Sequence, residues 1–153
     1  MARRPSPALP AAALHGSADD VEAEFYEALQ RADIERLMAL WADDDEIVCV
    51  HPGGGRAIGA AAIRTSFEAI FAGGGIAVRP EQVRRLAHLG GALHHLVERV
   101  EVRSDKGGPL AWVLASNLYI KTTQGWRLAA HHASPASRQE PAPMGDTAPG
   151  TLH

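Results

Sequence analysis

The spacing of apolar residues changes part-way along the chain, and this change limits the folds that the chain can adopt. Before Gly73, apolar residues mostly recur every three or four positions, as they do on one face of a helix. From Val83 onward they alternate with polar residues, which is typical of strands with one buried face. Helices that precede a series of strands predict an α+β domain in which the helices pack on one face of an antiparallel sheet.

Capping residues mark where the helices are expected to begin. Ser17 or Asp19 caps the first helix and Asp33 caps the second, because such side chains accept hydrogen bonds from the free N–H groups of a first turn. A third helix is expected over residues 60–71, where the apolar spacing is again helical. Between the second and third helices, the β-branched run 47–50 predicts a short strand.

Four longer strands are expected after the third helix. They cover residues 83–88, 92–102, 110–121 and 126–133. Turns that contain glycine separate them, at residues 90–91, 105–108 and 123–125. Because short turns connect neighbouring antiparallel strands, this series predicts a meander.

The two ends of the chain differ in composition from the segment between them. Residues 1–16 are rich in Ala and Pro, and residues 135–153 contain almost no large apolar residue. Neither end buries enough surface to offset the entropy that ordering would cost. We therefore expect flexible tails over 1–16 and 135–153 and one folded domain over 17–134. Prolines interrupt the first tail, which argues against a secretory signal.

Charge and cysteine content argue against several classes of function. The 153 residues carry 15 basic and 18 acidic side chains, so the chain lacks the basic excess of a nucleic-acid-binding protein. No apolar run approaches the roughly 20 residues of a membrane span. The single cysteine, Cys49, leaves no intramolecular disulfide and fits a reducing compartment, so we expect a cytoplasmic protein. The glycine runs 53–55 and 73–75 lack the Lys and Ser/Thr of a phosphate-binding loop, and no cofactor is expected.

Short motifs in the helical half and near the end of the chain form a set. They are Phe25-x-x-x-Leu29-x-x-x-Asp33, Leu40-Trp41-Ala42-Asp43-Asp44, Val50-His51-Pro52-Gly53, Gly125-Trp126-Arg127-Leu128 and His131-His132-Ala133-Ser134. The set resembles nuclear transport factor 2-like domains, in particular their SnoaL-like branch, and the association domain of calcium/calmodulin-dependent kinase II ends similarly. The resemblance implies a cone-shaped, cystatin-like fold with a pocket at its open end and a homodimer formed through the outer sheet face.

The resemblance also places some site residues of the ketosteroid isomerase members on this chain. Their carboxylate base precedes the Pro-Gly of the first strand, where this chain has His51. Their oxyanion-binding acid lies on the penultimate strand, where this chain has Asn117. Their oxyanion tyrosine corresponds to Phe25, with Tyr26 expected to point elsewhere. Since all three groups are replaced, steroid isomerisation by that mechanism is not expected.

The alternation of side chains along the strands predicts a further pair. His94 and Glu98 fall on the apolar face of one strand, and His132 shares a face with Leu128 on the last strand. Turns centred on residues 106–107 and 123–124 would place Glu98 opposite Ala115, and Ala115 opposite His132. We therefore expect Glu98 to orient His132 and to raise its pKa.

These arguments give one candidate site inside the cone. The expected catalytic residues are His51, Glu98, Asn117 and His132. The expected ligand-binding residues are Phe25, Trp41, His94, Ala115 and Tyr119. Two histidines and a carboxylate are a known metal-ligand set, but no spacing motif supports a metal, and none is expected.

The sequence is compatible with two functions. One is a cofactor-independent isomerase, cyclase or dehydratase acting on a small, largely apolar carbonyl compound, with His51 or His132 as general base and Asn117 bonding the oxyanion. The other is a non-catalytic ligand-binding or oligomerisation domain, in which Glu98 and His132 merely satisfy each other.

Overall fold

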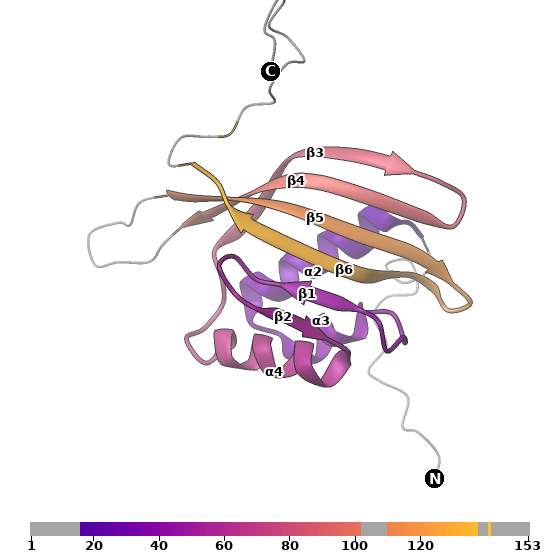
Figure 1. Cartoon of the computed structure of the whole chain (residues 1–153), viewed down its shortest axis with the longest axis horizontal. Coiled ribbons are helices and arrows are strands. Elements are labelled where there is room, and N and C mark those ends of the chain that lie inside the picture. Colours follow the sequence, from indigo (N-terminus) through magenta and orange to yellow (C-terminus); the bar gives the residue numbers. More distant parts are fainter. Residues whose placement is uncertain (1–15, 102–109, 138–140, 142–153) are drawn as a thin grey trace, which may run out of the picture.

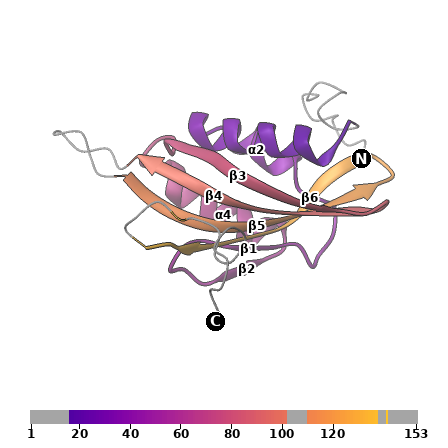
Figure 2. The same cartoon turned by 90° about the horizontal axis from the view of Figure 1, so that it is seen from above.

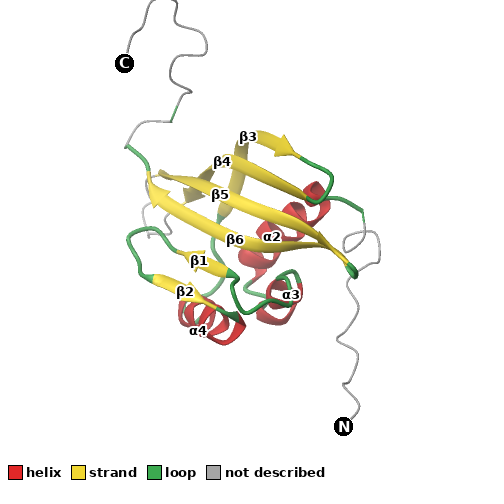
Figure 3. Ribbon diagram, turned by 45° about the vertical axis from the view of Figure 1, so that its right-hand side comes forward, coloured by secondary structure: helices red, strands yellow, loops and turns green. Residues whose placement is uncertain are grey.

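A computed structural model describes residues 16–101, 110–137 and 141 of the chain. The helices are α2 (Ala18–Arg31), α3 (Ile34–Ala39) and α4 (Ala60–Phe71). The strands are β1 (Val48–Val50), β2 (Arg56–Ile58), β3 (Val78–Ala87), β4 (Gly91–Glu101), β5 (Leu110–Thr122) and β6 (Gly125–Pro135). The helices precede the four long strands in the chain, and they lie together on one side of the curved sheet (Figures 1 and 3).

The six strands form a single sheet in the order β2-β1-β6-β5-β4-β3. Strands β3 to β6 are a meander of antiparallel neighbours, as expected. Strand β1 joins β6 in parallel and pairs with β2 in an antiparallel manner. The predicted α+β class, with helices packed on one face of a curved, mostly antiparallel sheet, is confirmed.

The helix starts agree with the capping residues. Ser17 is the N-cap of α2 and its side chain accepts a hydrogen bond from the Asp20 N–H, so Asp19 lies inside the first turn. The Asp33 side chain caps α3 in the same way, through the Arg36 N–H. Helix α4 covers the predicted residues but begins after Gly59 without a side-chain cap.

The strand boundaries differ from the expectations at several points. Strand β2 was not anticipated, because its short sequence follows a run of glycines. Strand β3 begins at Val78, and a bulge interrupts its pairing with β4 between Glu81 and Arg84. Strand β6 extends to Pro135, and the Ala136 N–H donates to the Trp112 carbonyl at 2.9 Å. The predicted turn 105–108 and most of both predicted tails lie outside the described residues, so the domain boundaries stay predictions.

Helix α2 lies along one face of the sheet and contacts β3, β5 and β6 (Figure 2). The predicted apolar stripe of α2 is buried, namely Val21, Phe25, Ala28 and Leu29. Glu22 and Tyr26 are buried beside this stripe. Within the described residues, no helix has the length and apolar composition that crossing a membrane requires.

Candidate functional site

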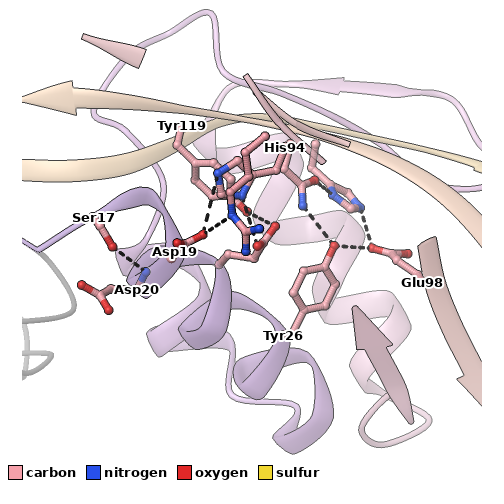
Figure 4. Close-up of polar contacts among 11 residues, drawn as sticks. Ser17, Asp19, Asp20, Tyr26, His94, Glu98 and Tyr119 are labelled. Carbon is pink, nitrogen blue, oxygen red and sulfur yellow. Dashed lines mark hydrogen bonds and ion pairs between the residues drawn. The ribbon is translucent and has the colours of Figure 1, made fainter. Parts of the chain in front are cut away.

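The space between α2 and the sheet contains a network of buried polar side chains (Figure 4). Glu22 and Tyr26 are four residues apart on α2 and therefore project from the same side of the helix. The sheet contributes buried residues from strands β4, β5 and β6, namely His94, Glu98, Asn117, Tyr119 and His131. The network has two parts, one around each buried glutamate.

The first part surrounds Glu98 on β4. The Tyr26 hydroxyl donates to Glu98 Oε2 at 2.8 Å. The Asn117 amide nitrogen donates to the Tyr26 hydroxyl at 3.0 Å, and the Asn117 amide oxygen lies 2.6 Å from His131 Nδ1. His131 Nε2 then faces Glu98 Oε2 across 3.9 Å, which closes the ring of four side chains.

These bonds determine the tautomer of His131. Since the Asn117 amide nitrogen is used on Tyr26, its oxygen accepts, and His131 must carry its proton on Nδ1. Nε2 is then unprotonated and presents a lone pair toward Glu98. A neutral imidazole with a free lone pair is a proton acceptor, and it lies beside a carboxyl group.

Burial shifts the pKa values of Glu98 and His131 in opposite directions. Burial raises the pKa of Glu98 to about 7, although the hydrogen bond from Tyr26 acts the other way. Burial, together with the smaller effects of His51 and His132, lowers the pKa of His131 to about 3. Near neutral pH, Glu98 therefore exchanges between acid and carboxylate while His131 stays neutral. Groups with displaced pKa values occur frequently at sites of proton transfer.

The second part surrounds Glu22 on α2. The Tyr119 hydroxyl donates to Glu22 Oε1 at 3.2 Å, and His94 Nδ1 lies 3.1 Å from Glu22 Oε2. The rings of His94 and Tyr119 meet edge to face, with centroids 4.9 Å apart. The predicted ligand-binding residues His94 and Tyr119 are thus both buried and both bonded to a glutamate that sequence reasoning missed.

The predicted Glu98–His132 pair is wrong, and the reason is the register of the last two hairpins. Glu98 pairs with Val113 rather than Ala115, and Ala115 pairs with Ala133 rather than His132. His132 is exposed on the outer side of the sheet.

A bulge in β6 explains why His131, and not His132, faces the interior. Tyr119 pairs with Leu128 and Leu118 pairs with Ala130, so Ala129 is an extra residue. The extra residue reverses the alternation, and His131 instead of His132 shares the inner face with Leu128.

The expectation that Tyr26 points away from the site is also wrong. Tyr26 is buried and lies in the network, while Phe25 packs beside it with ring centroids 5.2 Å apart. Phe25 also contacts the His131 ring, again at 5.2 Å between centroids. The spacing of Glu22 and Tyr26 next to the apolar stripe was the signal that would have identified both residues.

His51 lies at the edge of this region and outside the hydrogen-bonded ring. It is half-buried, and its Nε2 lies 2.9 Å from Ser66 Oγ and 3.8 Å from Cys49 Sγ. Burial lowers the pKa of His51. Burial and the charge of Glu98 raise the pKa of Cys49 to about 12, so this thiol stays protonated and is not a nucleophile.

The remaining predicted residues are in the core. Ala115 is buried on the inner face of β5. Trp41 is buried, and its indole N–H has no hydrogen-bond partner within the described residues.

Two surface cavities lie elsewhere. One, of about 230 Å³, is lined by Gln30, residues 76–79, Arg99 and Glu101. The other, of about 370 Å³, is lined by Glu46, Val48, Val50, Arg56, Ile58 and His132.

Comparison with known protein families shows which family the chain belongs to. Residues 19–138 match the family described as the SnoaL-like domain. The chain belongs to this family. The SnoaL-like match covers nearly all of the described residues, including every member of the two-part network. No curated protein sequence matches the chain.

Solved structures of similar fold carry several different descriptions. A Thiobacillus denitrificans protein provisionally described as a calcium/calmodulin-dependent protein kinase type II association domain is 28% identical, with a TM-score of 0.74 over 81% of this chain and 98% of that chain. A Streptomyces avermitilis protein provisionally described as a dehydratase of the NTF2-like family is 32% identical, with a TM-score of 0.66 over 76% of this chain and 92% of that chain.

A more distant structure shows the fold alone. The ketosteroid isomerase-like protein of Erwinia carotovora is 20% identical, with a TM-score of 0.62 over 78% of this chain and 93% of that chain. Of the two structures above 25% identity, one is thus described as a dehydratase and the other as an association domain.

Proposed function

We propose that this SnoaL-like domain binds a small, largely apolar carbonyl compound beneath α2 and transforms it by acid–base catalysis without a cofactor. The observation that carries the proposal is Glu98: a buried carboxyl group whose pKa is raised to about 7, which accepts a hydrogen bond from Tyr26 and faces the unprotonated nitrogen of His131. The relative described as a dehydratase, at 32% identity, supports an enzyme.

Three residues of the first part of the network, Glu98, Tyr26 and Asn117, have roles in this proposal. The Glu98 carboxylate removes a proton from the carbon next to the substrate carbonyl, and the resulting acid returns it to another carbon or to a departing hydroxyl group. The first outcome is an isomerisation, and the second releases water. Tyr26 has one hydroxyl proton, so its hydrogen bond moves from Glu98 Oε2 to the developing oxyanion. Asn117 holds Tyr26 and His131 in place.

Ligand entry requires a change in the network. In the structure the four polar groups bond to one another, so a ligand has to replace one of these contacts. The 3.9 Å separation between Glu98 and His131 is longer than a hydrogen bond, which makes it the contact that is most easily opened. His51, at the edge of the region, is available as a second proton acceptor.

The test is turnover of two ketones that yield a conjugated enone absorbing in the ultraviolet. A phenyl-substituted β-hydroxy ketone reports dehydration, and a β,γ-unsaturated cyclic ketone reports isomerisation. We expect Glu98→Gln and Tyr26→Phe to reduce turnover about 100-fold, the lower end of what acid–base assistance contributes. His132→Gln is the matched control, since this exposed histidine adjoins His131 and should leave turnover unchanged. Equal rates in Glu98→Gln and the wild type would refute the role of Glu98.

A second function is supported by the outer sheet face. Leu86 pairs with Leu93, Leu93 with Leu118, and Leu118 with Ala130, so an apolar row crosses four strands. Leu93 and Leu118 are 40% and 38% exposed. The relative described as an association domain, at 28% identity, supports assembly. We infer that this row forms the interface of a homodimer.

Mass measurement by light scattering tests the interface. We expect Leu118→Glu to convert the dimer to a monomer, because the introduced charge would be buried against the partner copy. Gln124→Glu, in the turn between β5 and β6, is the control and should remain dimeric. A monomeric wild type would contradict the interface, and a larger ring with no turnover of either ketone would favour an assembly domain over an enzyme.

A further inference from the structure

We propose that Asp19, Glu22 and His94 form a binding site for one divalent cation of the Zn²⁺ or Co²⁺ type. Asp19 and Glu22 are three residues apart on α2 and share a side of the helix. Asp19 lies close to His94 on β4 (Figure 4). One potential ligand atom from each residue lies within 4.8 Å of the other two. The site is separate from the Glu98 ring, and the proposal does not depend on the enzymatic function.

The orientation of His94 is the main argument. His94 is buried, and its Nδ1 lies 3.1 Å from Glu22 Oε2, while its Nε2 points to Asp19 Oδ1 at 3.9 Å. When Nδ1 donates its proton to Glu22, Nε2 presents a lone pair to a carboxylate oxygen. Two electron-rich atoms face each other there, at a distance longer than a hydrogen bond. A cation between them would coordinate both.

The donor set matches such a cation. One imidazole nitrogen and carboxylate oxygens are typical Zn²⁺ ligands, at about 2.0–2.2 Å from the metal. Bringing Nε2 and Oδ1 to the separation of two ligands in a tetrahedral site requires a movement of about 0.5 Å. Asp19 can make this movement because its side chain is 58% exposed. Glu22 either coordinates the cation directly or orients His94 from behind, as carboxylates do for metal-bound histidines.

Arg85 is the competitor for this site. Its Nε lies 2.8 Å from Asp19 Oδ1, the oxygen that faces His94. Asp19 Oδ1 accepts a hydrogen bond from the guanidinium, and this bond would weaken its coordination of a metal ion. The cation therefore has to displace Arg85. Arg85 is itself partly exposed and is able to turn into solvent. The proposal therefore predicts that removing Arg85 increases metal affinity.

The experiment uses the full chain, stripped with a chelator and titrated with Co²⁺ and then Zn²⁺. Calorimetry gives stoichiometry and affinity, and the visible absorption of bound Co²⁺ reports its coordination. We expect one equivalent in the wild type and in Asp20→Asn, which removes a charge from the same helical turn. Asp19→Asn and His94→Gln should bind at least about tenfold more weakly. Arg85→Gln should bind more tightly than the wild type.

The outcomes separate a metal site from a simple ion pair. If His94 instead carries a proton and pairs with Asp19, neither the wild type nor Arg85→Gln will bind Co²⁺ or Zn²⁺, and the proposal fails. Binding that is equal in Asp19→Asn and Asp20→Asn would place the metal elsewhere and would also overturn it. Asp19 is exposed, so Asp19→Asn keeps the test decisive even if His94→Gln does not fold.

Discussion

Glu98→Gln should be more stable than the wild type at alkaline pH, and its advantage should decrease by about 3 kcal/mol between pH 8.5 and pH 4.5. The pKa of Glu98 is raised from 4.5 to about 7 in the folded protein. The folded state therefore holds a proton that the unfolded state releases between these two values. Glu98 contributes stability that is present at acidic pH and is lost as pH rises through 7.

The measurement is urea unfolding of both proteins at several pH values. His131 acts in the opposite direction, since its pKa is lowered from 6.5 to about 3 and acid therefore favours unfolding. The wild-type curve alone consequently combines two opposed effects, and the difference between the two proteins isolates Glu98. A difference that does not vary with pH would mean that Glu98 is ionised at no cost, and the proposed proton exchange near neutral pH would be wrong.

Gly75→Ala should destabilise the protein by about 3 kcal/mol. A Cβ added at Gly75 would overlap the carbonyl oxygen of Gln30, with the carbonyl carbon only 2.8 Å away. The neighbouring backbone is fixed on α2, because the Ile76 N–H donates to the Leu29 carbonyl at 2.9 Å. The Gln30 side chain also donates to the Val78 carbonyl at 2.7 Å. Neither backbone can move away without breaking such bonds.

Gly73→Ala is the matched control for this prediction. Its added Cβ would meet the Ile70 carbonyl oxygen at 3.7 Å, an ordinary contact, and its φ angle is not positive. We expect a change within about 0.5 kcal/mol. Thermal and urea unfolding of both variants test the pair. Similar stability of Gly75→Ala and Gly73→Ala would show that the segment after α4 is not tightly held against α2.

The sequence was sufficient to predict the fold because local signals and global topology agree. The caps at Ser17 and Asp33, the helix over 60–71 and the period-two segments each follow from nearby residues. Strand β2 was missed because three residues after a glycine run carry no periodicity. The start of β3 was missed because Pro80 lies within it, and proline usually argues against a strand.

The site was predicted only in part, and the failures have geometric causes. Alternation along β4 correctly placed His94 and Glu98 on the buried face. It failed on β6 because a bulge adds one residue, and no residue type marks such a bulge when the residue is alanine. The analogy assigned the position of the oxyanion tyrosine to Phe25 and left Tyr26 out of the site, although a helix buries neighbouring positions together. Which side chains join the hydrogen-bonded network depends on contacts between residues far apart in the sequence, and the spacing of residues along one helix or strand does not specify these contacts.

The bulge at Ala129 affects which residues of this chain are matched to the functional residues of a homologue in a sequence alignment. A homologue that lacks the extra residue aligns with this chain only if a one-residue gap is opened, and an aligner has little basis for choosing where. If the gap is placed after the two histidines, His132 is matched to a position that faces the interior in the homologue. A functional residue equivalent to His131 would then be copied to Ala130. His132 would receive the role of the equivalent of Ala133, although His132 lies on the opposite side of the sheet from Glu98. Aligning the strands by their hydrogen-bond partners, with Asn117 opposite His131, avoids this error.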